Sequence, residues 1–159
     1  MSQRDDRLAQ AAARLDFPLE GEIGKGGDYA PVVRDGDRLY VSGQVPRVGT
    51  TVVVTGRAGA DVPLERAQQA ARICALRALV LLRRELGSLE PIERIPKVNV
   101  YTQSAENFTQ QSEVADAASA LIVEVLGPGA AHARTSIGVY QLPKNATVEL
   151  DLIATLAGG

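Results

Sequence analysis

Arg134 stands in the segment that is richest in groups able to bind an anion. It follows Gly127–Gly129, whose two glycines free the backbone, and it lies two residues after His132, the only histidine of the chain. Thr135 and Ser136 come directly after it. Because a guanidinium presents a planar fork of donors that matches a carboxylate, this segment is a candidate anion pocket.

Glu149 and Asp151 share the polar face of the last predicted strand, and Arg134 and Ser136 are expected on its neighbour. An arginine and a glutamate on paired strands lie close together. The pair is either part of a site or a surface ion pair worth at most about 1 kcal/mol. His132 is likewise either a general base or a loop histidine that bonds to the backbone.

Further candidates lie in the first half of the chain. Ser42-Gly43 ends a predicted strand, where a glycine marks either a bulge or the close approach of a ligand. Tyr29 and Tyr101 either orient a ligand or pack at the sheet edge. Cys74 lies in an apolar helix and is interpreted as an inert buried residue. Gly21–Gly27 is interpreted as a connector, since Gly-Lys there is not followed by the Ser or Thr of a phosphate loop.

The composition excludes several classes of protein. The 17 Lys and Arg residues are balanced by 19 Asp and Glu, and aromatic residues make up 4%, so we expect no nucleic-acid partner. One Cys and one His cannot build a structural zinc site or an intramolecular disulfide. No apolar run approaches the length of about 20 residues that spans a membrane, and the N-terminus lacks the apolar core of a signal peptide. We therefore expect a cytoplasmic protein without a membrane or metal partner.

The periodicity predicts one domain of strands and helices. Helices are predicted at residues 5–15, 64–86 and 105–126. Strands are predicted at residues 29–33, 38–45, 51–54, 92–102, 134–140 and 147–156. Asp61 is expected to cap the second helix with Pro63 in its first turn, and Pro96 indicates an edge strand or a bulge. This order favours an α+β fold with helices on one face of a mixed sheet.

Four short motifs, in order, resemble the Rid/YjgF family of enamine and imine deaminases, formerly called L-PSP endoribonucleases. Leu39–Pro46 (LYVSGQVP) resembles its ISGQ-P segment, and His132–Ser136 (HARTS) resembles its P-A-R-S-C motif. Leu142–Lys144 and Val148–Leu150 resemble its closing L-P-x…h-E-h strand, and Tyr29 resembles its early tyrosine. The resemblance covers nearly the whole chain.

The resemblance implies a chorismate-mutase-like α+β fold, with a mainly antiparallel sheet and two helices on one face. It implies a homotrimer with ligand clefts between subunits and no cofactor. Residues 1–27 would then be an N-terminal helical extension and loop, and residues 28–159 the family domain. The extension is longer than in short members, which indicates a long-form subgroup.

The family's catalytic arginine falls on Arg134, which would grip the carboxylate of the substrate. The family glutamate that helps to activate water falls on Glu149. Tyr29 and Ser42-Gly43 would bind substrate. Ser136, also a substrate-binding candidate, replaces the family cysteine.

A second departure is Gly138, which stands where many deaminases carry a glutamate. The resemblance implies a hydrolytic deaminase that converts imines and enamines of amino acids into 2-keto acids and ammonia. The alternative is a non-catalytic trimer that senses small carboxylates through Arg134. An endoribonuclease is disfavoured, because the chain is acidic and has one histidine.

Overall fold

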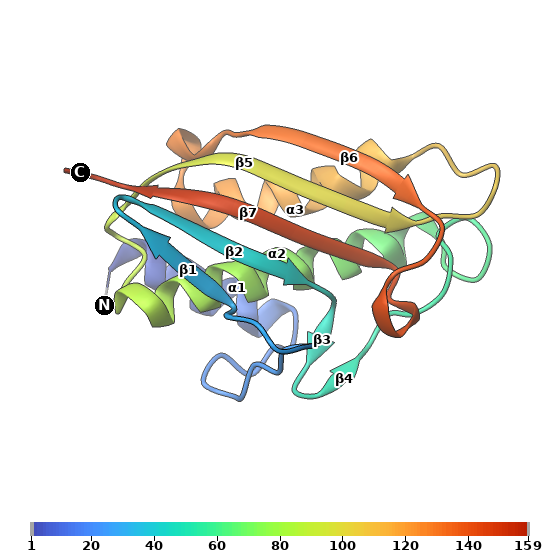
Figure 1. The fold of residues 1–159 in the computed structure, drawn as a ribbon, viewed down its shortest axis with the longest axis horizontal. Helices are drawn as coiled ribbons and strands as arrows, with labels where there is room; N and C mark the ends of the chain where they lie inside the picture. Colours follow the sequence, from blue (N-terminus) through green and yellow to red (C-terminus); the bar gives the residue numbers. More distant parts are fainter. Residues whose placement is uncertain (1, 159) are drawn as a thin grey trace.

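The computed structural model describes residues 2–158, which form a five-stranded sheet with its helices on one face (Figure 1). The strand order is β1-β2-β7-β5-β6. These strands are β1 (Val32–Asp35), β2 (Arg38–Gln44), β5 (Ile92–Gln103), β6 (Ala133–Val139) and β7 (Val148–Leu156). A separate pair is formed by β3 (Arg47–Val48) and β4 (Thr51–Val52). The helices are α1 (Gln3–Arg14), α2 (Leu64–Leu86) and α3 (Gln111–Leu126), with short 3₁₀ turns η1 (Pro128–Ala130) and η2 (Pro143–Asn145).

All neighbouring strands of the large sheet are antiparallel except β5 and β6, which are parallel and are joined through α3. A parallel pair needs such a crossover, whereas β1 and β2 are joined by the predicted tight turn, in which Gly36 has φ 62°. The mixed, mainly antiparallel α+β fold is confirmed.

The core lies between the sheet and α2. The side chains of β7 point alternately into this core and to the other face of the sheet. Every second residue of β7, from Val148 to Leu156, is buried against the helices. The middle of α2 is buried on all sides, as its apolar run predicts, and the helix ends at Gly87 in the left-handed conformation.

The predicted N-cap of α2, Asp61, is wrong. Pro63 occupies the N-cap position, with no side-chain hydrogen bond to the helix. Asp61 instead accepts a hydrogen bond from the backbone N–H of Arg57 at 3.3 Å. The carboxylate therefore closes the preceding turn, and the helix begins without a side-chain cap.

The predicted third helix begins six residues too early. Helix α3 starts at Gln111, not at residue 105. The backbone N–H of Ala105 bonds to Ala58, and the ring of Phe108 packs where a Cβ on Gly59 would stand, 2.8 Å away. Tertiary contacts of this segment therefore replace the first helical turns.

Three strand predictions also change. The first strand begins at Val32, directly after Pro31. The predicted third strand is shorter than expected, since only Thr51–Val52 forms β4, and it pairs with β3 outside the main sheet. Strand β5 lies inside the sheet, so the edge interpretation of Pro96 is wrong. The register shift between Arg94 and Lys97 supports the bulge instead.

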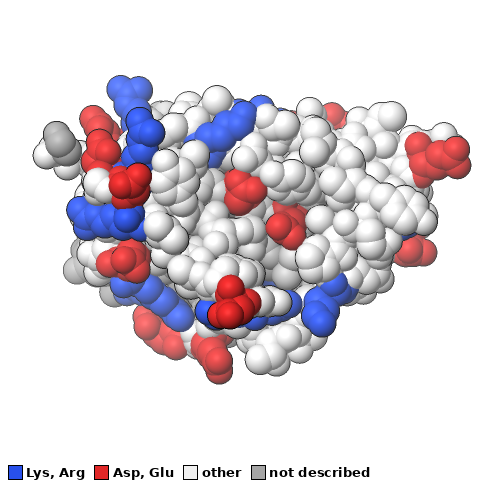
Figure 2. All heavy atoms as spheres, in the orientation of Figure 1, with Lys and Arg blue, Asp and Glu red and all other residues white. Residues whose placement is uncertain are grey.

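The face of the sheet opposite the helices is covered by no helix or strand of residues 2–158 (Figure 1). Cross-strand pairs place Val33 with Tyr40 on this open face, and Tyr101 with Ile137. Glu149 also lies there, opposite Tyr101. Figure 2, in the same view, shows acidic side chains near the middle of a largely uncharged surface. The open face thus exposes apolar side chains around a few carboxylates.

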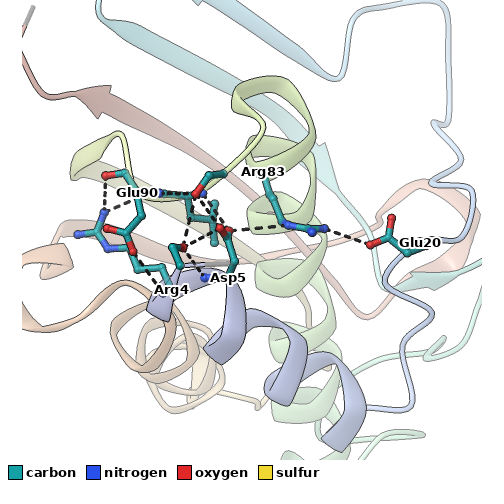
Figure 3. A network of polar contacts seen from close by, with 8 residues as sticks. Arg4, Asp5, Glu20, Arg83 and Glu90 are labelled. Atoms are coloured by element: carbon teal, nitrogen blue, oxygen red, sulfur yellow. Dashed lines mark hydrogen bonds and ion pairs between the residues drawn. The ribbon is translucent and has the colours of Figure 1, made fainter.

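Helix α1 packs on α2 and α3, and a polar network fastens its first turn (Figure 3). The carboxylate of Asp5 accepts hydrogen bonds from the hydroxyl of Ser88 at 2.6 Å and the backbone N–H of Leu89 at 3.0 Å. Arg4 donates to the carbonyl of Ile92 at 2.6 Å. The division of the chain at residue 27 stays a prediction.

Asp5→Ala should lower the free energy of unfolding by about 2 kcal/mol at pH 7, because it leaves the buried Leu89 N–H without its partner. Burial raises the pKa of Asp5, but hydrogen bonds from Ser2, Ser88 and Leu89 and the charge of Arg83 outweigh it, so the pKa is lowered. The carboxylate therefore stabilises the fold above pH ~4, and this stabilisation is lost as the pH falls through the folded-state pKa.

Urea unfolding at pH 7 and at pH 3 measures both effects. The control is Asp6→Ala, which removes an exposed carboxylate from the same helical turn and should cost less than about 1 kcal/mol. Equal losses in the two variants would contradict a specific role for Asp5.

Candidate active site

A pocket of about 440 Å³ opens where β2 ends beside the start of β7. Four of the six site residues predicted from the sequence line it: Tyr29, Ser42, Gly43 and Glu149. A cavity of this size suits a small metabolite. The structure therefore brings these residues together.

Gly43 and Glu149 make the closest approach in this pocket. The register of β2 against β7 shifts by one residue between Val41 and Gln44, so Ser42-Gly43 forms a bulge. A Cβ built on Gly43 would stand 2.1 Å from Oε2 of Glu149, a distance that atoms cannot adopt. The bulge interpretation of this glycine is confirmed, and the Glu149 side chain takes the space that a Cβ would need, whereas the approach of a ligand stays a prediction.

The environment of Glu149 favours its protonated form. Burial raises the pKa of Glu149, and the negative charge of Asp151 raises it further. Asp151 itself accepts a hydrogen bond from the side chain of Asn99 at 2.8 Å. None of the ion pairs within residues 2–158 involves Glu149. A carboxyl group whose pKa is raised in this way holds a proton more readily than a free glutamate and is suited to proton transfer.

Ser42 and Tyr29 shape the wall beside this carboxyl group. The hydroxyl of Ser42 donates to the carbonyl of Ala30 at 2.7 Å and so ties the bulge to the segment that carries Tyr29. The Tyr29 hydroxyl accepts a hydrogen bond from the backbone N–H of Gly26 at 3.4 Å. Tyr29 is 42% exposed, so its ring and hydroxyl are accessible to a ligand.

Three cations at the pocket were missed as functional residues by the sequence analysis: Lys25, Arg47 and Arg77. Lys25 belongs to the segment interpreted as a connector. The signal that could have revealed Arg77 is a charged residue in the middle of an apolar helix, because a buried charge requires polar partners.

Arg134 lies elsewhere, and the predicted pairing of its strand with that of Glu149 is wrong. Strand β5 separates β6 from β7. Arg134 is paired with Val98, whose side chain faces the helices, whereas Glu149 lies on the open face. The two residues therefore stand on opposite faces of the sheet.

Helix α3 holds the Arg134 guanidinium at the edge of the sheet. It donates to the carboxylate of Asp116 at 2.9 Å and to the hydroxyl of Ser119 at 3.0 Å. The Asp116 side chain is 67% exposed, so this ion pair is open to exchange with a carboxylate ligand. Arg134 is thus positioned at the surface of the chain, away from the pocket.

His132 takes the role of a loop histidine. Its Nδ1 lies 2.8 Å from the carbonyl of Ala130, and its Nε2 lies 2.8 Å from the hydroxyl of Ser119. It therefore supports the same serine that contacts Arg134. This arrangement favours a positioning role over that of a general base.

Two residues that depart from the family motifs, Ser136 and Gly138, both lie next to side chains of α3. The hydroxyl of Ser136 lies 3.5 Å from that of Ser112 on α3. A Cβ on Gly138 would stand 2.8 Å from the side-chain nitrogen of Gln111. The amide of Gln111 thus occupies the space next to position 138, and a glutamate there would require it to move.

Other groups add no chemistry to the site. Cys74 is fully buried, which raises the pKa of its thiol, and the sulfur lies 3.7 Å from the carbonyl of Val148. The prediction of a buried cysteine is confirmed. Within residues 2–158 no three His, Cys, Asp or Glu side chains gather in a way that would hold a metal ion. None of the helices in that range is long and apolar enough to cross a membrane.

The fold and pocket define a chain of the Rid/YjgF class, and comparison with known proteins agrees. The family model described as Endoribonuclease L-PSP matches residues 20–156, so the chain belongs to this family. It is 38% identical over 151 residues to Protein TCP17 of Trypanosoma cruzi, covering 94% of each chain.

Two further relatives bear on function and fold. A 2-iminobutanoate/2-iminopropanoate deaminase of Dermatophagoides farinae is 29% identical over 132 residues, which cover 82% of this chain and 87% of that protein. A Shewanella oneidensis structure described as a candidate endoribonuclease is 25% identical, with a TM-score of 0.88, and the match covers 98% of this chain and 100% of that one. The family and its α+β fold are thereby confirmed.

Glu149→Gln should raise the free energy of unfolding at pH 7. The folded protein raises the pKa of this carboxyl above its unfolded value, so ionisation costs stability once the pH exceeds ~4.3. The neutral amide does not incur this cost. Urea unfolding at pH 7 should show the gain, and at pH 3.5 the two proteins should be equal. A loss of stability at pH 7 would contradict the raised pKa.

Proposed function

We propose that this protein is a hydrolytic deaminase that converts imines and enamines of amino acids into 2-keto acids and ammonia. The observation that carries the proposal is the Glu149 carboxyl group, pressed against Gly43 in a pocket of metabolite size with a raised pKa. The family relationship and the named activity of the Dermatophagoides farinae relative support it.

The proposed reaction needs several proton transfers, and one group, Glu149, carries them. Water attacks the imine carbon while Glu149 takes a proton from it and passes this proton to the nitrogen. The carbon–nitrogen bond of the resulting carbinolamine then breaks as Glu149 carries the hydroxyl proton to the nitrogen, which yields the keto acid and ammonia. An enamine first gains a proton on carbon and loses one from nitrogen to give the imine. A carboxyl group with a raised pKa is suited to these transfers.

The substrate carboxylate is assigned to Arg134 of a second copy. Within one chain, Arg134 and Glu149 are separated by two strand spacings and three residues, or about 14 Å between Cα atoms, and they face opposite ways. A small imine cannot contact both. A homotrimer, as the family resemblance implies, would bring the β6 edge of one copy to the pocket of the next.

Two features of the chain support such an assembly. Val33, Tyr40 and Ile137 are exposed on the open face, an apolar surface of the kind that protein interfaces cover. Arg134 is held at the edge of the molecule by Asp116 and Ser119, with its guanidinium ordered before any partner arrives. Preorganisation of this kind lowers the entropic cost of binding.

Keto-acid release should be accelerated when a threonine dehydratase generates the enamine in situ, and Arg134→Ala or Glu149→Gln should slow it by about 100-fold or more, the usual worth of a positioned acid–base group. Arg72→Ala is the matched control, because this arginine does not line the pocket and donates a hydrogen bond to Gln69 of its own helix. If no precursor is turned over but 2-oxobutanoate binds in an Arg134-dependent manner, the protein is the carboxylate sensor of the alternative reading.

Mixing the two inactive variants tests the shared site directly. In a cyclic oligomer that exchanges subunits at random, a site is intact when its Arg134 and Glu149 come from the complementary variants, so an equal mixture should recover ~25% of wild-type activity. The measurement is turnover after partial denaturation and refolding together. Recovery of no activity, with trimers present by light scattering, would contradict a site between copies.

A further inference from the structure

We propose that the pocket contains a second anion subsite, formed by Arg47 and Lys25, and that the preferred substrates are imines whose side chain ends in a carboxylate, such as those of glutamate or aspartate. The inference deepens the proposed function and rests on it. It concerns the end of the pocket away from the Arg134 of a neighbouring copy.

The first observation is the concentration of positive charge. Lys25, Arg47 and Arg77 line a pocket whose only acidic lining residue is Glu149. None of the three cations takes part in an ion pair within the part of the chain that is described. The pocket therefore carries a surplus of positive charge that no protein carboxylate neutralises.

The second observation is the way in which Arg77 is buried. It is 2% exposed, and its guanidinium donates to Oε1 of Gln44 at 3.1 Å and to the carbonyls of Arg47 and Gly24 at 3.0 and 2.7 Å. All three acceptors are neutral. Arg77 thus keeps its charge, and its donors bond to residues of the pocket wall. It therefore adds positive electrostatic potential to the pocket and positions Arg47 by bonding to its carbonyl.

Arg47 is the group placed to meet a ligand. Its Nε is buried and has no hydrogen-bond partner. Its terminal nitrogen Nη2 lies 3.3 Å from the place where a Cβ on Gly26 would stand, and the Tyr29 hydroxyl lies 3.8 Å from the same point. Arg47 and Tyr29 therefore both lie next to Gly26, in space that any larger residue at position 26 would restrict.

Lys25 stands at the mouth of this end of the pocket. Its ammonium donates to the carbonyl of Tyr29 at 2.6 Å and lies 6.0 Å from the centroid of that ring. The residue is exposed, so the ammonium is free to turn towards an entering anion. A carboxylate fits the fork of Arg47, and the pocket volume of about 440 Å³ admits a four- or five-carbon dicarboxylate.

The two ends of the pocket are distinct in charge. Glu149 stands against Gly43, whereas the guanidinium of Arg47 lies 3.9 and 3.3 Å from where a Cβ on Gly24 and on Gly26 would stand, on either side of Lys25. Arg47 does act on Arg77: burial and then this nearby positive charge lower the pKa of Arg77 to about 10. An imine with a distal carboxylate would therefore extend from the reacting end to the cationic end.

The test compares two imines of the same shape. Glutamate and norvaline oxidation supplies imines that differ only in a terminal carboxylate or methyl group. Wild-type kcat/KM should favour the glutamate imine by about 10- to 100-fold, the usual worth of a charge-assisted hydrogen bond. Arg47→Leu should slow the glutamate imine far more than the norvaline imine, so that this preference is lost, and Arg47→Lys should restore part of it. The matched control Arg72→Ala should leave the preference unchanged.

Two results would overturn the subsite: equal kcat/KM for both imines in the wild type, or an equal loss for both in Arg47→Leu. Either leaves the deaminase proposal standing, since turnover is present. If neither imine is turned over, the deaminase proposal fails, and calorimetry decides the subsite. Binding of 2-oxoglutarate tighter than 2-oxopentanoate, with the difference lost in folded Arg47→Leu, supports it, whereas equal affinities overturn it.

Discussion

The buried guanidinium of Arg77 is the interaction on which the pocket depends. Removing a charge from water is unfavourable unless polar groups replace the lost hydration, and here three oxygen acceptors do so. Each acceptor belongs to a different segment: the end of β2, strand β3 and the loop that follows α1. One side chain of α2 therefore ties together three segments that are not paired with one another as strands in the described part of the chain. The arrangement of the pocket wall therefore depends on α2.

A second constraint comes from the two-residue period of the strands. In β6, Arg134 and Ser136 face α3, and in β7 the odd-numbered residues, Glu149 among them, face away from the helices. No change of rotamer moves a side chain across a sheet. A mechanism that uses both Arg134 and Glu149 therefore requires two copies of the chain, and the exposed apolar residues of the open face provide the surface through which copies can associate.

Local patterns predicted most of the elements, whereas strand order was beyond them. The hairpin at Gly36, the end of α2 at Gly87 and the bulge at Gly43 each have a short-range cause in glycine geometry. The neighbour of β7 was predicted wrongly because consecutive strands usually pair, while here β5 inserts between β6 and β7. The cationic end of the pocket was missed for a related reason, since Lys25, Arg47 and Arg77 meet only in the folded chain.

The segment between α1 and Lys25 forms part of the pocket as well as part of the N-terminal extension. Arginines of α2 hold it along its length: Arg84 donates to the carbonyl of Leu19 at 3.0 Å, Arg83 contacts Glu20 at 3.3 Å, and Arg77 reaches Gly24. These contacts carry the chain from α1 to the rim of the pocket and place Lys25 there. A family member without this segment would lack the lysine and the glycine loop above Arg47. Differences in substrate among members should therefore follow the N-terminal segment, even where the bulge and the carboxyl group of the reacting end are the same.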